Sequence, residues 1–69
     1  MSVKKNGLSE REFEVLQLIV EGLTDRQIAY ELGITQHTAN AHRKSLVKKM
    51  KVNNTASLVA AAFRKRLVK

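Results

Sequence analysis

The sequence predicts an all-α fold, a four-helix bundle with a central helix-turn-helix. Four segments carry apolar residues at intervals of three and four, the spacing that gives a helix one buried face. The chain has three glycines, each at an end of one of these segments, and no proline that would break them. Its 69 residues suffice for one domain only. We assign residues 8–69 to that domain and interpret residues 1–7 as a flexible tail or the stub of a linker.

The first helix is predicted over about residues 9–21. Ser9 and Glu12 match the S-x-x-E capping box, in which the hydroxyl accepts from a free backbone N–H and the glutamate reaches back to the cap. Gly22 follows in the position of a C-terminal cap glycine. The residues expected to face inward are Leu16, Ile19 and Val20, with Val15 beside them.

The second helix is predicted over about residues 25–32, with Thr24 as its N-cap and Gly33 at its end. Its apolar face consists of Ile28, Ala29 and Leu32.

The third helix is predicted over about residues 36–50, with Thr35 as its N-cap. Its apolar stripe is narrow and consists of Ala39, His42, Leu46 and Met50. The opposite face carries Asn40, Lys44 and Lys48 at four-residue intervals, flanked by His37, Ala41, Arg43 and Lys51. This helix therefore combines a thin buried stripe with a wide basic face.

The fourth helix is predicted from Asn54 or Thr55, either of which can cap it, to about residue 66. We expect Leu58, Val59, Ala62 and Phe63 to face inward. Ala56, Ala60 and Ala61 would then form a small, smooth outer surface that permits close approach of another helix. Alanine is also simply a good helix former, which explains the same residues without a partner.

The charge is strongly positive and unevenly distributed along the chain. Thirteen basic and six acidic residues give a formal net charge of +7, and the sequence pI is about 10.3. All six acidic residues lie within the first 31 positions, whereas residues 32–69 contain nine basic residues and no acidic one. A pI above about 9 with clustered basic residues is typical of a nucleic-acid-binding domain. A solvated basic face, or attraction to an anionic membrane surface, would account for the same composition.

The composition also excludes several classes of protein. Without cysteine there are no disulfides, no thiol catalysis and no cysteine-ligated zinc. His37 and His42 lie about 140° apart around a helix, so they cannot share a metal ion. Asp25 is the only aspartate and no convergent catalytic set accompanies it, so we expect no enzymatic activity and no cofactor. The sequence has no apolar run of the ~18 residues that a membrane span needs and no signal peptide, which makes the cytoplasm the simplest compartment.

The second and third helices are joined by residues 33–35, a short turn with a glycine that is typical of a helix-turn-helix. The later helix of such a pair enters the DNA major groove, where Lys pairs with guanine, Asn pairs with adenine, and a methyl group contacts thymine. We therefore expect base contacts from Asn40, Ala41 and Lys44. Phosphate contacts are expected from Thr35, Thr38, Arg43, Lys48, Lys49 and Lys51.

The ordered motifs resemble the LuxR/FixJ/GerE-type DNA-binding domain, also found at the C-terminus of NarL-like response regulators. The similarity extends over about residues 8–67. The matching residues are Leu8-Ser9-x-Arg11-Glu12-x-x-Val15-Leu16, Gly22-Leu23-Thr24, Ile28-Ala29-x-x-Leu32, Ile34-Thr35-x-x-Thr38, His42-Arg43, Lys49-Met50 and Val52.

This resemblance implies a sequence-specific double-stranded DNA-binding module of a bacterial transcription regulator. The family's base-facing positions fall on Asn40, Ala41 and Lys44. The fourth helix commonly forms the dimer contact in this family, which implies a homodimer through the surface of Ala56, Ala60 and Ala61, on half-sites about 10 base pairs apart. RNA polymerase would be a further partner.

Two departures from the family pattern affect these expectations. Asn40 stands where many members have lysine and Ala39 where many have valine, so the family's sequence preference does not transfer. Thr55 stands where many members have an arginine that would pair with Glu12, so Glu12 is expected to rely on Ser9, Arg11 or a backbone group.

Two other interpretations remain open from the sequence. Region 4 of a sigma factor shares the Leu-Ser-x-Arg-Glu opening, but His42 and the long helix after Asn54 favour the LuxR type. A basic protein-interaction adaptor that uses the same helices without DNA is the alternative from another class.

Overall fold

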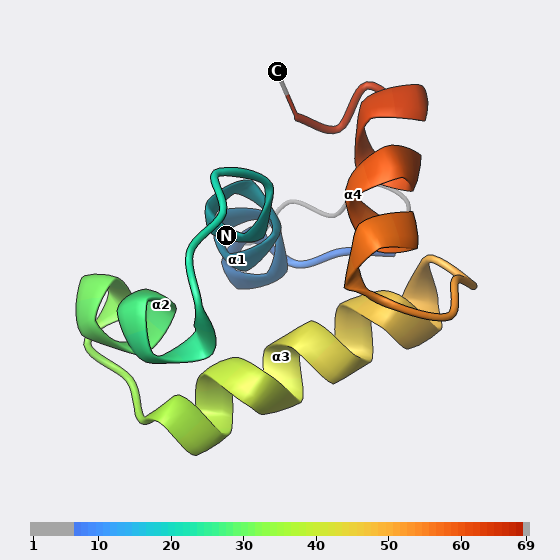
Figure 1. Ribbon diagram of the computed structural model, residues 1–69. Helices are drawn as coiled ribbons and strands as arrows, with labels where there is room; N and C mark the ends of the chain where they lie inside the picture. The colour runs from blue at the N-terminus through green and yellow to red at the C-terminus, as the bar shows by residue number, and fades with distance from the viewer. Residues whose placement is uncertain (1–6, 69) are drawn as a thin grey trace.

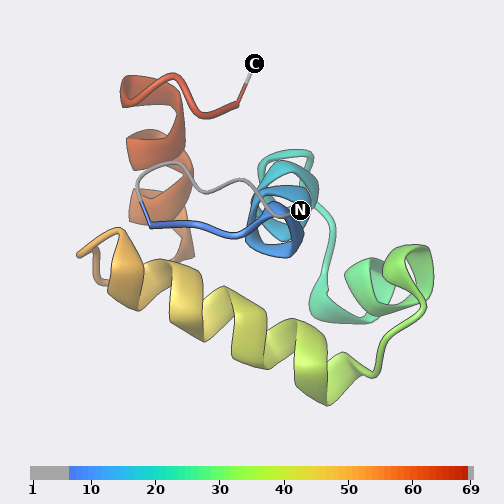
Figure 2. The same ribbon diagram turned by 180° about the vertical axis from the view of Figure 1, so that it is seen from behind.

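The computed structural model describes residues 7–68, which form an all-α fold of four helices, as predicted. The helices are α1 (Glu10–Val20), α2 (Asp25–Leu32), α3 (Gln36–Lys49) and α4 (Thr55–Arg64). Residues 1–6 of the predicted tail lie outside the described residues. Figures 1 and 2 show α3 running along one side of the molecule, beneath α1 and α2, with α4 rising from the far end of α3.

The helix starts follow the predicted capping chemistry. At α1 the backbone N–H of Ser9 donates to Glu12 Oε1 at 2.9 Å, and the Ser9 hydroxyl accepts from the Glu12 N–H at 3.2 Å. Thr24 and Gln27 form the same reciprocal pair at α2, for which the sequence had predicted only the Thr24 cap. Asn54 caps α4 and accepts from the N–H of the third helical residue. These bonds satisfy backbone donors that the first turn of a helix leaves free.

Each helix is followed within two residues by a residue with a positive φ. Gly22 follows α1 with φ +91°, and Gly33 follows α2 with φ +67°, a left-handed conformation that suits glycine. Lys51 and Arg66 adopt the same conformation after α3 and α4, with φ of +56° and +57°. Arg66 was expected to be the last helical residue, but α4 ends at Arg64 because Arg66 turns the chain back instead.

The core contains most of the inward residues that the sequence predicted for α1, α2 and α3, but Val20, Leu32 and His42 are only partly buried. Val15, Leu16, Ile28, Ala39 and Leu46 have no exposed surface. The remaining buried apolar residues are Leu8, Ile19, Ala29, Met50, Leu58, Ala61 and Ala62.

The orientation predicted for α4 is wrong at two residues. Phe63 was expected inside but is 49% exposed, whereas Ala61, expected on the outer surface, is 1% exposed. The buried face is set by Leu58, Ala61 and Ala62, three and four residues apart. Phe63 is five residues from Leu58 and thus lies about 140° around the helix from it.

Candidate nucleic-acid interface

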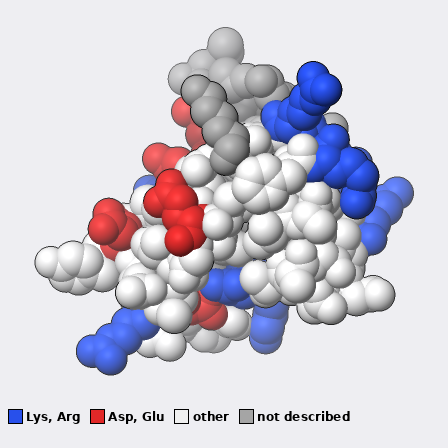
Figure 3. All heavy atoms as spheres, turned by 45° about the horizontal axis from the view of Figure 1, so that its top comes forward, with Lys and Arg blue, Asp and Glu red and all other residues white. Residues whose placement is uncertain are grey.

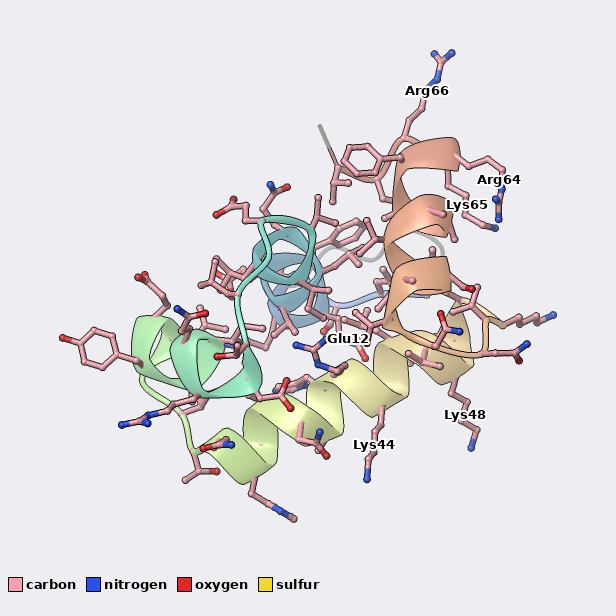
Figure 4. All side chains as sticks on the ribbon, in the orientation of Figure 1. Glu12, Lys44, Lys48, Arg64, Lys65 and Arg66 are labelled. Carbon is pink, nitrogen blue, oxygen red and sulfur yellow. The ribbon has the colours of Figure 1, made fainter. Side chains whose placement is uncertain are left out.

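One face of α3 packs against the core and the other faces solvent. Ala39 and Leu46 are fully buried, which fixes the rotation of the helix about its axis. Ala41, Lys44 and Lys48 are exposed on the opposite side. Figure 4 shows Lys44 and Lys48 pointing away from the rest of the molecule. The structure thus places these predicted DNA contacts on one outward surface, which we call the outer face of α3.

The turn that precedes α3 is held by backbone and threonine hydrogen bonds. The Ile34 N–H donates to the Ala29 carbonyl at 3.0 Å, which anchors the turn to α2. Thr35 caps α3 as predicted: its hydroxyl accepts from the Thr38 N–H at 3.0 Å and donates to the Thr38 hydroxyl oxygen at 2.8 Å. α3 has no acidic residue in its first turn, so the positive end of its dipole is not compensated there.

Arg43 lies elsewhere than the sequence predicted. Its Nε donates to Asp25 Oδ1 at 2.7 Å, its Nη1 to the Thr55 hydroxyl at 3.1 Å, and its Nη2 to the Leu23 carbonyl at 3.4 Å. The side chain is only 18% exposed. A guanidinium satisfied in this way joins α2, α3 and α4, so Arg43 holds the helix-turn-helix together and is not part of the exposed basic face.

Asp25 is the residue that the sequence reasoning missed. Besides the Arg43 bond, its Oδ2 accepts from Asn40 Nδ2 at 2.9 Å. Burial disfavours the charged form of Asp25, but the hydrogen bonds from Asn40 and Arg43 and the charge of Arg43 outweigh it and lower the pKa of the carboxyl. Asp25 is therefore ionised at neutral pH. Eighteen residues separate it from Arg43, so no local pattern in the sequence could have linked the two.

A second carboxylate, Glu12, connects α1 to α3. Lys49 Nζ donates to Glu12 Oε1 at 2.9 Å and the Ser45 hydroxyl to Glu12 Oε2 at 3.1 Å, in addition to the Ser9 cap. Burial raises the pKa of Glu12, but the hydrogen bonds from Ser9, Lys49 and Ser45 outweigh it and lower the pKa to about 2. Of the expected alternatives, Ser9 is the partner of Glu12, whereas Arg11 Nε lies 3.6 Å from Glu14 Oε1 instead. The bonds from Lys49 and Ser45 were not expected.

Lys49 is therefore a second basic residue whose side chain is held within the domain. It was predicted to contact phosphate in a cluster with no acid nearby, yet it is ion-paired with Glu12 and donates to the Gly7 carbonyl at 3.3 Å. Among the ion pairs of residues 7–68, none involves Lys44, Lys48 or Lys51. These three lysines carry the charge that remains available at the α3 surface.

The predicted dimer surface is partly retained on α4. Ala56 and Ala60 are exposed, but Ala61 belongs to the core and is excluded from this surface. Phe63 shares a face with Ala60 and Ala56, at spacings of three and four. The exposed side of α4 thus carries two alanines and a half-exposed phenylalanine, with Arg64 at its end.

Charges are separated across the molecule. Figure 3 shows most acidic side chains on one side of the molecule and a group of basic side chains opposite them, with further basic side chains below the acidic ones. Arg64, Lys65 and Arg66 are exposed at the end of α4, at a distance from Lys44 and Lys48, and Arg66 points away from those two lysines (Figure 4). In residues 7–68 no helix has the length and hydropathy to cross a bilayer, and no three His, Asp or Glu side chains are grouped to hold a metal.

The sequence matches a protein family described as bacterial regulatory proteins, luxR family, over residues 6–62. It is 46% identical over 56 residues to the transcriptional regulatory protein MctR of Rhizobium johnstonii, a match that covers 81% of this chain and 26% of that protein. The chain spans about a quarter to two fifths of the length of the curated relatives it matches.

Two solved structures resemble the fold. The transcription factor GerE superposes with a TM-score of 0.87 over 96% of this chain and 97% of its own, at 23% identity. The response regulator ChrA of a heme-sensing two-component system superposes with a TM-score of 0.84 over 94% of this chain and 32% of its own, at 35% identity. Because the family model matches residues 6–62, the chain belongs to the luxR family of bacterial regulatory proteins, as a helix-turn-helix DNA-binding domain of a transcription regulator.

Proposed function

We propose that this chain reads a specific double-stranded DNA sequence by inserting the outer face of α3 into the major groove. The observation that carries the proposal is the outward position of Lys44 and Lys48 on a helix that has no acidic residue. α3 has 14 residues, so it is about 21 Å long and can follow the groove for several base pairs.

Base contacts are assigned to Asn40, Ala41 and Lys44, which lie next to one another on α3. Lys44 is suited to the O6 and N7 acceptors of guanine, and the Ala41 methyl to the methyl group of thymine. Ala41 is also small, which lets the helix backbone approach the base edges. Asn40 is half-buried, and its amide nitrogen donates to Asp25.

Phosphate contacts are assigned to Thr35, Thr38, Lys48 and Lys51. The two threonines lie at the N-terminal end of α3, where free N–H groups and the helix dipole favour an anion. Lys48 and Lys51 are exposed near its C-terminal end. Contacts at both ends of the helix would fix its register in the groove without reading sequence.

Self-association is assigned to α4. Ala56 and Ala60 allow close approach of a second helix, and Phe63 supplies apolar surface beside them. A homodimer through this face would place two copies of α3 on half-sites about 10 base pairs apart. In a longer regulator, this domain would be the output module, and RNA polymerase at the promoter would be a further partner.

Selection from a randomised duplex pool tests the proposal, with the bound fraction sequenced at two salt concentrations. We expect an enriched motif in two copies, related by a two-fold axis or in tandem. Salt-sensitive retention of DNA without any enrichment would contradict specific reading, and a chain that retains no DNA at low salt would favour the adaptor interpretation.

A further inference from the structure

The side chain of Asp25, on α2, accepts hydrogen bonds from two residues of α3, the helix proposed to enter the major groove. It is the first residue of α2, where the positive end of the helix dipole favours a carboxylate. One of its oxygens accepts from Arg43 at 2.7 Å and the other from Asn40 at 2.9 Å. Its side chain is only 20% exposed. Because Arg43 neutralises it, this carboxylate can lie beside a DNA-binding surface without repelling phosphates.

The bond to Asp25 determines which way the Asn40 amide faces. A carboxylate has only acceptor oxygens, so the nitrogen of Asn40 must face it. An unrestrained asparagine amide can turn over and exchange its donor and acceptor sides. Here that exchange would bring the Asn40 oxygen against the Asp25 carboxylate, two acceptors in contact. The amide is thereby held with Oδ1 as its free acceptor.

We infer that Asp25 is a specificity-determining positioning residue: it holds Asn40 so that the amide oxygen accepts from the exocyclic amino group of adenine or cytosine. This inference rests on the proposed function, in which Asn40 faces a base pair. Asp25 itself does not contact DNA. The alternative role for Asp25 is purely structural, in which it docks α2 onto α3 through Arg43 and has no influence on base choice.

Three variants separate these roles when each is put through the same duplex selection as the unmodified chain. Asn40→Ala defines the base pair that Asn40 reads, as the position at which preference disappears. Asp25→Asn keeps the shape of the side chain but can donate as well as accept, so it releases the Asn40 amide. Arg43→Gln is the matched control, because it removes the charged partner of Asp25 and leaves the Asn40 bond in place.

At the base pair defined by Asn40→Ala, Asp25→Asn is expected to lose roughly three- to tenfold in discrimination, which is the value of one hydrogen bond. It should keep the preference at the base pair assigned to Lys44. Arg43→Gln should weaken binding to all sequences alike and keep the preference at the Asn40 pair. The inference is overturned if Asp25→Asn retains that preference, or if it weakens binding evenly at every position. It is equally overturned if Asn40→Ala changes no position.

A second measurement uses the unmodified chain, so it tests the inference even if Asp25→Asn does not fold. At the pair read by Asn40, the preferred base is replaced by an analogue that lacks the exocyclic amino group. The unmodified chain should bind this duplex roughly three- to tenfold more weakly, whereas Asn40→Ala should bind both duplexes equally. Equal binding by the unmodified chain overturns the inference while leaving the proposed function standing. A chain that selects no motif at all contradicts the proposed function itself, which is a distinguishable result.

Discussion

Lys44 is exposed at the middle of the outer face of α3, between Ala41 and Lys48. In the proposed complex it bonds a guanine edge, an interaction that discriminates by about 1–3 kcal/mol. Lys44→Ala should therefore weaken specific binding about 5- to 150-fold and relax preference at one base pair, measured by titration of matched and single-mismatch duplexes. Lys65→Ala, an equal loss of charge at the far end of α4, should change neither quantity by more than about twofold. Equal effects of the two variants would contradict the assignment.

Glu12 makes the stability of the domain depend on pH. Its pKa is lowered from 4.5 to about 2, so the folded state favours the carboxylate more than the unfolded chain does. The resulting stabilisation, about 3 kcal/mol, is present above pH 5 and is lost as the pH falls toward 2. The lowered pKa of Asp25 acts in the same direction.

Urea unfolding at a series of pH values measures this contribution. The unmodified domain should lose stability steeply between about pH 5 and pH 2. Glu12→Gln should be less stable at pH 7 and show a much flatter pH dependence, whereas Glu10→Gln, an exposed neighbour, should follow the unmodified curve. A Glu12→Gln curve parallel to that of the unmodified domain would show that the Lys49 and Ser45 contacts do not favour the charged form.

The sequence predicted individual site residues unevenly, and the reason is the distance along the chain between partners. Lys44 and Lys48 were placed correctly on an outward face because helical periodicity determines which way a residue points. Arg43 and Lys49 were expected to be free to contact phosphate, but they are ion-paired with Asp25 and Glu12, which lie on other helices. Periodicity identifies a face of a helix but does not identify the partner that a long side chain at its edge will bind.

At the scale of elements, the ends of helices were predicted from capping chemistry, and the rotation of α4 was not. Ser9, Thr24 and Thr35 start helices as expected because short polar side chains satisfy the free N–H groups of a first turn. Four of the ten residues of α4 are alanine, so its apolar pattern has little contrast between faces. The burial of Ala61 instead of Phe63 follows from packing against the other helices, which the pattern does not encode.

Lys51, two residues after the end of α3, has a backbone conformation that is unfavourable for residues other than glycine. Its φ is +56°, and the turn is closed by a 3.1 Å bond from the Val52 N–H to the Val47 carbonyl. Lys51→Gly should raise the free energy of unfolding by about 0.5–1 kcal/mol, seen as a higher melting temperature. Lys44→Gly, within the helix, should lower it by about 1 kcal/mol. A lower melting temperature for Lys51→Gly would indicate that contacts of the Lys51 side chain outweigh the backbone strain.

At the scale of the whole molecule, the charge that can meet DNA is smaller than the net charge suggests. Of the basic residues on α3, Arg43 and Lys49 are ion-paired within the domain. Lys44 is assigned to a base, so the cations that remain for phosphate contacts are Lys48 and, just after α3, Lys51: two per copy and four in a dimer. The logarithm of affinity should then fall with the logarithm of salt concentration at a slope near −4 for a dimer. A slope near −2 would indicate a single copy on DNA, and a flat response would contradict the electrostatic account.

Two exposed basic surfaces of the molecule are candidates for the DNA contact. The outer face of α3 and the cluster of Arg64, Lys65 and Arg66 are both basic and exposed, and they point in different directions (Figure 4). Only the first belongs to a helix-turn-helix, and only the first combines cations with small and amide side chains suited to base edges.

Titration of the isotope-labelled domain with the selected duplex, followed by NMR, distinguishes these surfaces residue by residue. We expect the largest chemical-shift changes on Thr35, Ala41, Lys44 and Lys48, with smaller changes on residues 64–66. Changes confined to residues 64–66, with Ala41 and Lys44 unperturbed at saturation, would contradict the central claim that α3 enters the groove.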